Sequence, residues 1–176
     1  LVNQDLHIIE NRNKYTVNPD VTLGSSKWVD MHRYRSHTEN TLECVQRLKR
    51  DGYRIVVTTP HAENVTPATI DLKGPMAFCF GTELTGASDV LMAHADEHLR
   101  IPMHGFTESY NISVSAAIVL YTVMERLRAS EVDWRLSPAD LLTLKLQWAR
   151  KVVHSAQHLE ARFRLDAGEG DASKMS

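Results

Sequence analysis

Apolar positions along the chain follow two spacings in turn, and this predicts a fold that alternates strands with helices. A β-branched run at residues 53–58 and a wholly apolar run at 76–80 are typical of strands buried on both faces of a parallel sheet. Shorter apolar runs predict further strands over residues 5–10, 27–31 and 99–103. Apolar residues three or four positions apart predict helices over residues 38–50, 88–98, 113–128 and 138–163.

The helical spacing also predicts which face of each helix is buried. The apolar positions expected to face the core are Leu42, Val45 and Leu48 in the first helix, Val90, Leu91 and Ala95 in the second, Val114, Ile118 and Tyr121 in the third, and Leu141, Leu144, Trp148, Val152, Leu159 and Phe163 in the last. Thr38 is the expected cap of the first helix, and Ser137 followed by Pro138 is a start signal for the last.

The order of these elements indicates an α/β domain with a helical extension. Alternating strands and helices favour a parallel sheet covered on both faces, whose ligands bind at the carboxyl ends of the strands. We expect the α/β domain to occupy residues 1–130 and the helical extension residues 131–165. Residues 166–176 form a small, polar tail that we expect to be disordered or loosely held.

The composition is that of an ordinary soluble globular protein. The 176 residues fit one core, and 43% of them are hydrophobic and 24% charged. No apolar run approaches the ~18 residues that a membrane span needs. Cys44 and Cys79 lie far apart without a C-x-x-C pattern, which favours a reducing, cytoplasmic setting. The start L-V-N-Q-D lacks both Met and a leader pattern, so we expect chain to precede Leu1.

The candidate chemistry lies between residues 81 and 121. The segment G-T-E-L-T-G at 81–86 follows a predicted strand, and R-I-P-M-H-G-F-T-E-S-Y-N-I-S-V-S-A-A-I-V-L-Y runs from Arg100 to Tyr121 into an Ala-rich helix. Such glycine- and proline-marked loops build a pocket largely from main-chain groups, which suits a small polar cofactor. Taken alone, the first segment is equally well explained as a tight turn.

Together, these two segments resemble the SpoU/TrmH-type RNA 2′-O-ribose methyltransferases of the SPOUT superfamily. In that family a G-x-E-x-x-G turn is followed by I-P-M-x-G-x-x-x-S-L-N-V-S-x-A-x-x-I, and this chain differs chiefly by Tyr110 in place of Leu. Upstream, G-S-S-K-W-V at 24–29 and I-V-V-T-T-P at 55–60 are similar to two further family segments. The resemblance extends from about Asp5 to Arg128.

The resemblance implies a fold, a reaction and partners. The expected fold is an α/β parallel-sheet domain with a deep C-terminal trefoil knot, and the expected assembly is a homodimer. The expected reaction is 2′-O-methylation of the ribose in a structured RNA, tRNA rather than rRNA, with S-adenosyl-L-methionine as methyl donor. We expect no membrane association and no metal.

The resemblance also implies which residues form the site. The cofactor is expected to contact Thr58, Gly81, Leu84, Ile101, Met103, Gly105 and Tyr110. Asn111, Glu83 and Ser113 are the expected polar members of the reaction centre, with Glu83 bracing the loops. The family handles the ribose proton with an arginine in an N-x-x-x-x-x-R segment, which we expect before Leu1.

Simpler explanations stay open for several of these residues. Asn111 precedes a predicted helix and could be only its cap. Ile101 and Met103 could be only core residues.

Two further groups of side chains are candidates for binding. Arg12, Lys14, Arg33 and Arg35 are candidate RNA contacts in a net basic segment, or ordinary surface charge. His94 and His98, like His154 and His158, have the i, i+4 spacing of zinc ligands on a helix, but we expect solvated helix faces because neither pair has an evident third ligand.

Two other functions compete with methyl transfer. One is a non-catalytic dimeric module that binds or assembles RNA and retains the knotted fold. The other is an unrelated nucleotide-binding αβ enzyme, which would place Gly81 and Gly105 far from any ligand.

Overall fold

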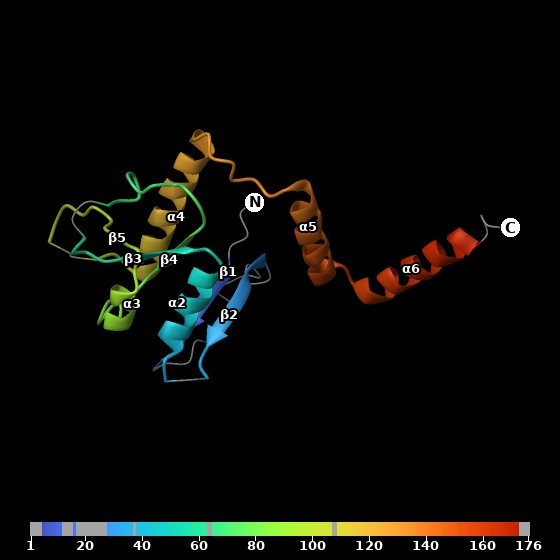
Figure 1. Cartoon of the computed structure of the whole chain (residues 1–176), viewed down its shortest axis with the longest axis horizontal. Coiled ribbons are helices and arrows are strands. Elements are labelled where there is room, and N and C mark those ends of the chain that lie inside the picture. The colour runs from blue at the N-terminus through green and yellow to red at the C-terminus, as the bar shows by residue number, and fades with distance from the viewer. Residues whose placement is uncertain are drawn as a thin grey trace. The chain divides into compact units, whose positions relative to one another are not determined.

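The structure is a computed structural model that describes residues 5–11, 16, 28–36, 38–62, 65–106 and 109–172, the last five as backbone only. The chain divides into two compact units, of which the larger comprises residues 5–17 and 31–134 and the smaller is built mainly from residues 135–176. The elements, in order, are β1 (Asp5–Ile9), β2 (Asp30–Tyr34), α2 (Asn40–Arg50), β3 (Arg54–Thr58), β4 (Met76–Cys79), α3 (Asp89–Ala93), β5 (Glu97–Leu99), α4 (Ile112–Ala129), α5 (Pro138–Val152) and α6 (Ala156–Ala172) (Figure 1).

A parallel sheet in the order β4-β3-β5 forms the centre of the larger unit. Successive β3 side chains point to opposite faces, as strand geometry requires. Ile55 and Val57 join a core cluster with residues of α2 and α3, whereas Val56 packs with Val119 and Val123 of α4. The predicted parallel sheet with helices on both faces is therefore confirmed.

The strands β1 and β2 pair with each other in a separate two-stranded sheet. Tyr34 is buried in the same core cluster as the inner face of α2, and Ile9 packs against that cluster. The Asn11 side-chain amide donates to the Thr41 hydroxyl at 2.8 Å, which fastens the end of β1 to the first turn of α2. The two-stranded sheet is thus held by both apolar and polar contacts.

Asp96, just before β5, connects three elements through its carboxylate. One oxygen accepts from Lys49 Nζ of α2 at 2.6 Å, and the other accepts from the Ile55 backbone N–H of β3 at 2.8 Å. The Asp96 N–H in turn donates to the Ile55 carbonyl at 2.9 Å. These bonds fix where β5 enters the sheet.

The helix predicted over residues 88–98 is wrong in length. Its cap is Ser88, whose hydroxyl accepts from the Leu91 N–H at 3.3 Å, but α3 ends at Ala93. The reason is the next strand: β5 begins at Glu97, two residues before the predicted start, because Asp96 is already bonded to β3. Leu91 is buried as predicted, whereas Val90 is exposed. His94 and His98 therefore do not share a helix.

Two predictions about the helices of the larger unit are also corrected. In α4 the buried positions are Val119 and Val123, and Val114 and Tyr121 are exposed. This helix is apolar on most sides, so periodicity alone cannot select the inward face. The residue that caps α2 is Glu39 rather than Thr38, and it makes no side-chain capping bond in the described part of the chain.

The C-terminal extension contains two helices where the sequence predicts one. Ser137 caps α5 by accepting from the Asp140 N–H at 3.1 Å, and Pro138 is the first helical residue, both as predicted. The helix breaks after Val152, and Ser155 takes a left-handed conformation with φ 58°. Of the predicted stripe, Leu144 is buried, but Val152, Leu159 and Phe163 are exposed.

The second helix of the extension, α6, runs to Ala172 and so covers most of the tail expected to be loosely held. Extending a helix costs far less than starting one, so a polar tail can continue an existing helix. A bidentate pair of Arg150 and Glu160 spans the break between α5 and α6, with N–O distances of 2.6 and 2.8 Å. Among the described residues, no helix combines the length and apolar character needed to cross a membrane.

We predict that Asp96→Asn lowers the free energy of unfolding by about 1 kcal/mol, because an amide cannot accept hydrogen bonds from both Lys49 and the Ile55 N–H. Burial raises the pKa of Asp96, but the hydrogen bonds from Lys49 and Ile55 outweigh burial and lower it below 3.8. The carboxylate therefore stabilises the fold above its ordinary pKa, and this stability is lost as the pH falls through the lowered value.

Urea unfolding of the wild type and Asp96→Asn between pH 3 and 7 measures this contribution. The difference between them should shrink as the pH falls. Glu131→Gln, which removes an exposed carboxylate beyond α4, is the matched control and should change little. A difference that is constant with pH would contradict the assignment.

Candidate functional site

The loop at residues 81–86 is a closed turn that requires glycine. Thr82 and Gly86 exchange backbone hydrogen bonds of 3.0 and 2.9 Å, and Gly86 has φ +67°. A Cβ added at Gly81 would lie 2.1 Å from the Gly86 carbonyl carbon, closer than atoms can approach. The turn expected from the G-x-E-x-x-G pattern is present, and Gly81 is the residue that lets it close.

Thr58 joins the ends of two of the three strands that lead into the site loops. Its hydroxyl donates to the Cys79 carbonyl at 3.0 Å, joining the last residue of β3 to the last residue of β4. Because the two strands are parallel, their carboxyl ends meet at one edge of the sheet. The loops after both strands therefore start side by side.

Asn111 connects the closed turn to the start of α4. Its Nδ2 donates to Glu83 Oε1 at 2.7 Å across 28 residues of sequence, and its Oδ1 accepts from the Ser113 N–H at 2.9 Å. The second bond makes Asn111 the N-cap of α4, as the simpler explanation anticipated. The first bond brings together two of the predicted site residues, and both are exposed.

A small pocket lies between the β3 end and the loop that leads into α4. Four of the seven predicted cofactor contacts line it, together with residues that the prediction omitted: Thr58, Ile101, Met103 and Tyr110, with Thr59, Pro60, Ser109 and Ser115. Within the described residues, Gly81, Leu84 and Gly105 are not part of this lining. Gly105 has φ +152°, a conformation that favours glycine, and the Leu84 side chain is 98% exposed.

The pocket lining combines hydroxyl groups with apolar side chains. Ile101 lines the pocket and also packs against the core cluster of Val56 and Leu99, so the core and cofactor interpretations of this residue are compatible. The omitted residues had a recognisable signal. Thr59 and Pro60 directly follow β3, and Ser115 lies one helical turn after Asn111.

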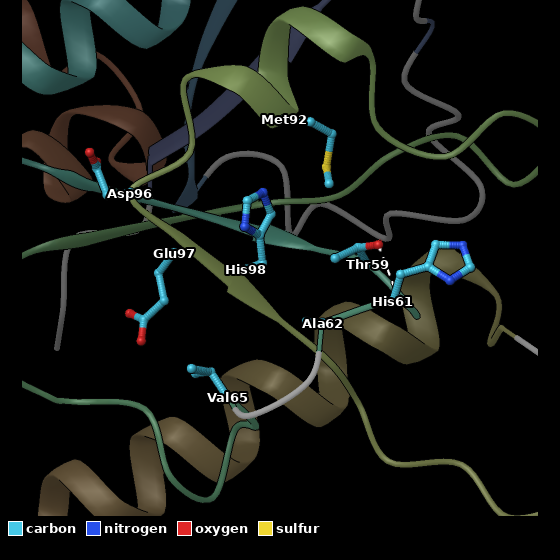
Figure 2. Close-up of a pocket in the computed structure, with 8 residues that line it drawn as sticks. All are labelled: Thr59, His61, Ala62, Val65, Met92, Asp96, Glu97 and His98. Carbon is cyan, nitrogen blue, oxygen red and sulfur yellow. Dashed lines mark hydrogen bonds between the residues drawn. The ribbon is translucent and has the colours of Figure 1, made fainter.

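A larger depression lies on another part of the same unit. Figure 2 shows Met92 of α3 and His98 of β5 facing each other across it, with Thr59 and His61 from the loop after β3 on one side. The carboxylates at its rim are already engaged, since Asp96 binds Lys49 and Glu97 faces Arg54. None of the predicted cofactor contacts lines this depression, and among the described residues Thr59 is the one that it shares with the lining of the small pocket. We therefore do not take the larger depression as the site.

The four candidate RNA contacts have different surroundings. Arg33 forms an ion pair with Glu10 at 3.4 Å, and the Glu10 carboxylate partly neutralises its charge. Arg35 is exposed just after β2. Arg12 and Lys14 lie outside the described residues.

One group of side chains was missed by the sequence analysis altogether. Asp5, His7 and His32 come together on β1 and β2, with one possible ligand atom from each lying within 4.8 Å of the others. Part of the signal was present, because D-x-H in a strand places both side chains on one face. His32 joins these two residues because β2 pairs with β1.

We predict that Gly81→Ala opens the 82–86 turn and destabilises the protein by several kcal/mol, because a methyl group would overlap the backbone at Gly86. The matched control is Gly74→Ala, which has φ +74° but open space around its Cβ position, and should lose only about 1 kcal/mol. Chemical unfolding of both variants measures the difference. Equal losses would show that the close approach at Gly81 is unimportant.

Comparison with known proteins places this geometry in a family. The SpoU rRNA methylase family matches residues 2–121. The chain is 45% identical over 156 residues to the tRNA (guanosine(18)-2′-O)-methyltransferase of Borreliella burgdorferi, covering 89% of this chain and 70% of that protein. It is 34% identical over 130 residues to the enzyme of the same name from Thermus thermophilus, covering 73% of this chain and 65% of that protein.

A solved structure supports the same relationship. The TrmH/SpoU tRNA modifying enzyme of A. aeolicus superposes with a TM-score of 0.68 at 28% identity, covering 86% of this chain and 77% of that one. The resemblance found in the loops at 81–86 and 100–113 thus extends over most of the chain, which belongs to the SpoU rRNA methylase family.

Proposed function

We propose that this protein transfers a methyl group from S-adenosylmethionine to the ribose 2′-hydroxyl of a guanosine in tRNA. The observation that carries the proposal is the hydrogen bond between Asn111 and Glu83, which joins the family's two site loops beside a pocket lined by Thr58, Ile101, Met103 and Tyr110. The tRNA substrate is inferred from the names of the related proteins, of which this chain spans 65 to 70% of the length.

In this reaction the protein forms no covalent bond with either substrate. The ribose oxygen attacks the methyl carbon in line with the sulfonium, the carbon–sulfur bond breaks, and the hydroxyl proton leaves to a base or to water. S-adenosylhomocysteine and the methylated ribose are the products. The protein's task is therefore to orient two substrates.

The chemical character of the pocket residues suits the methyl donor. Apolar Ile101 and Met103 offer walls for an adenine ring, and the hydroxyls of Thr59, Ser109 and Ser115 offer hydrogen-bonding groups around the pocket. Gly81 and Gly105 permit the backbone conformations of the neighbouring loops. In this proposal Asn111, Glu83 and Ser113 keep the loops positioned beside the ribose, and an arginine implied by the family resemblance handles its proton.

In this proposal each part of the chain has its own role. Residues 1–130 form the methyltransferase domain, in which the loops around the pocket belong to a trefoil knot. Residues 131–165 and the tail at 166–176 form the helical extension, and Arg12, Lys14, Arg33 and Arg35 contact tRNA phosphates. We expect the protein to act in the cytoplasm.

Asn111→Asp tests the proposal more cleanly than alanine does. Aspartate keeps an oxygen that can cap α4, but it removes the amide that donates to Glu83 and sets two carboxylates against each other. We expect methyl transfer to a tRNA transcript to fall at least about tenfold, with the melting temperature little changed. Glu83→Gln, which keeps an acceptor oxygen, is the matched control and should retain more activity.

The readout is radiolabelled methyl from S-adenosylmethionine retained on the tRNA. Transfer by Asn111→Asp at the wild-type rate would contradict the role of this hydrogen bond. Wild-type protein that binds S-adenosylhomocysteine in calorimetry but methylates no RNA would favour the non-catalytic module. Protein that neither binds the cofactor nor transfers methyl would contradict the proposal as a whole.

We also propose a homodimer that covers the apolar surface around the site. Large apolar side chains of the site loops and of α4 are exposed, namely Leu84, Phe106, Tyr110, Ile112, Val114 and Tyr121. Exposed apolar groups in this number mark an interaction surface. A second copy would bury them, as the family resemblance implies.

We predict that Tyr121→Glu shifts the dimer toward monomer, raising its dissociation constant at least about tenfold, because a charge would have to be buried without a partner. Tyr121 is 71% exposed in the single chain, so the variant should still fold. Val90→Glu, which changes an exposed apolar residue of α3, is the control. Sedimentation velocity distinguishes the outcomes, and an unchanged dimer in Tyr121→Glu would place the interface elsewhere.

A further inference from the structure

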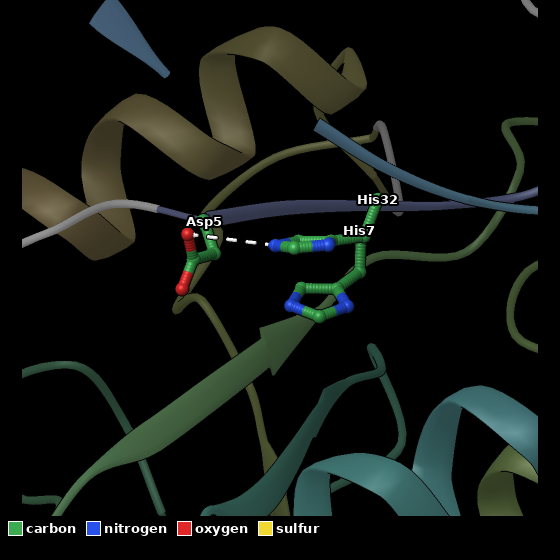
Figure 3. A group of neighbouring side chains, drawn as sticks. All are labelled: Asp5, His7 and His32. Atoms are coloured by element: carbon green, nitrogen blue, oxygen red, sulfur yellow. Dashed lines mark ion pairs between the residues drawn. The ribbon is translucent and has the colours of Figure 1, made fainter. Parts of the chain in front are cut away.

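Asp5, His7 and His32 form a compact cluster on the sheet of β1 and β2. Asp5 and His7 are two residues apart in β1 and so lie on the same face, and His32 comes from the neighbouring strand. His32 Nε2 lies 3.6 Å from Asp5 Oδ1, and the two imidazole rings stack with their centroids 4.7 Å apart. Figure 3 shows both rings turning a nitrogen toward the side on which the Asp5 carboxylate lies.

Tyr34 orients the His7 ring. Its hydroxyl lies 3.0 Å from His7 Nδ1, and Tyr34 is itself buried in the core. When Nδ1 carries the proton and donates to the tyrosine oxygen, the lone pair on Nε2 is free to act as a ligand. A hydrogen bond of this kind behind a ligating histidine is a regular feature of metal sites.

We propose that His7 Nε2, His32 Nε2 and the Asp5 carboxylate bind a divalent transition-metal ion of the zinc class, with water as the fourth ligand. Two imidazoles and a carboxylate are ligands that zinc accepts in a tetrahedral site. With bonds of ~2.1 Å such ligands lie ~3.4 Å apart. One possible ligand atom from each residue lies within 4.8 Å of the others, so binding requires side-chain rotations that draw these atoms in by up to about 1.4 Å and turn the two stacked rings toward one point.

The surroundings leave the cluster able to bind a cation. Arg47 opposes a bound cation, whereas Asp51 on the same helical turn favours it, and both act on His7. Asp5 is exposed and the two histidines are half-buried, so an ion can enter from solvent.

The metal would stabilise the two-stranded sheet instead of taking part in chemistry. It would cross-link β1 to β2, whose attachment to α2 otherwise depends on Tyr34, Ile9 and a few polar contacts. The cluster belongs to the β1–β2 sheet, and the site loops emerge from the strands β3, β4 and β5 of the other sheet. The inference therefore does not depend on the proposed methyl transfer.

The test is titration of the chelator-treated full chain with Co²⁺, whose visible spectrum reports tetrahedral coordination, and with Zn²⁺ in calorimetry. We expect one ion per chain and a higher melting temperature in its presence. His32→Ala and Asp5→Asn should abolish the tetrahedral spectrum. Tyr34→Phe, which keeps all three ligands, should weaken binding by about tenfold.

Adventitious binding is the alternative, since the chain has nine histidines. His94→Ala is the control, because that ring is exposed and is bonded to the Val90 carbonyl of the helix α3 that precedes it. Loss of Co²⁺ binding in His32→Ala but not in His94→Ala supports the site. Unchanged binding in both His32→Ala and Asp5→Asn, or a wild type without a tetrahedral spectrum, overturns it. If His32→Ala does not fold by circular dichroism, Asp5→Asn alone decides, because asparagine keeps the size and shape of this partly exposed side chain.

Discussion

The hydrogen bond from Asn111 to Glu83 is the contact on which the arrangement of the site depends. It joins a turn that follows one strand to the first residue before a long helix, and the two partners are separated by 28 residues. The same side chain also caps α4, because its oxygen accepts from the Ser113 N–H while its amide nitrogen donates to Glu83. Helix start, turn and pocket are therefore positioned by one side chain.

The turn and the sheet supply the rigid frame for that contact. Gly81 allows the chain to fold back on Gly86, and Thr58 fixes the ends of β3 and β4 to each other. Behind them, the alternation of Ile55, Val56 and Val57 between two core clusters prevents any slip of β3, since a shift by one residue would exchange its faces. Apolar burial thus fixes the position of the polar residues at the edge of the sheet.

The sequence predicted the features that have short-range causes. The strands predicted over 53–58 and 76–80, the glycine turn and the Ser137–Pro138 helix start follow from local patterns, and each is present, although β4 is half-buried where full burial was expected. The motif resemblance reached further, because it identified four residues that line the pocket.

What the sequence could not predict depends on contacts between distant segments. The early end of α3 follows from Asp96 bonding to β3, and the choice of buried face on α4 follows from which side meets the sheet. The histidine cluster requires the pairing of β1 with β2. No glycine or proline marks the break between α5 and α6 in the sequence. The left-handed backbone of Ser155 at this break is uncommon for serine.

We propose that the small pocket between the strand ends and the α4 loop holds the methyl donor. Backbone amide NMR spectra recorded during titration with S-adenosylhomocysteine test it most directly. If the methyl donor binds there, the largest shifts should occur at Ile101, Met103 and Tyr110, and at Thr58 and Thr59. Shifts concentrated instead at Met92, His98 and Val65, which line the larger depression, would contradict it.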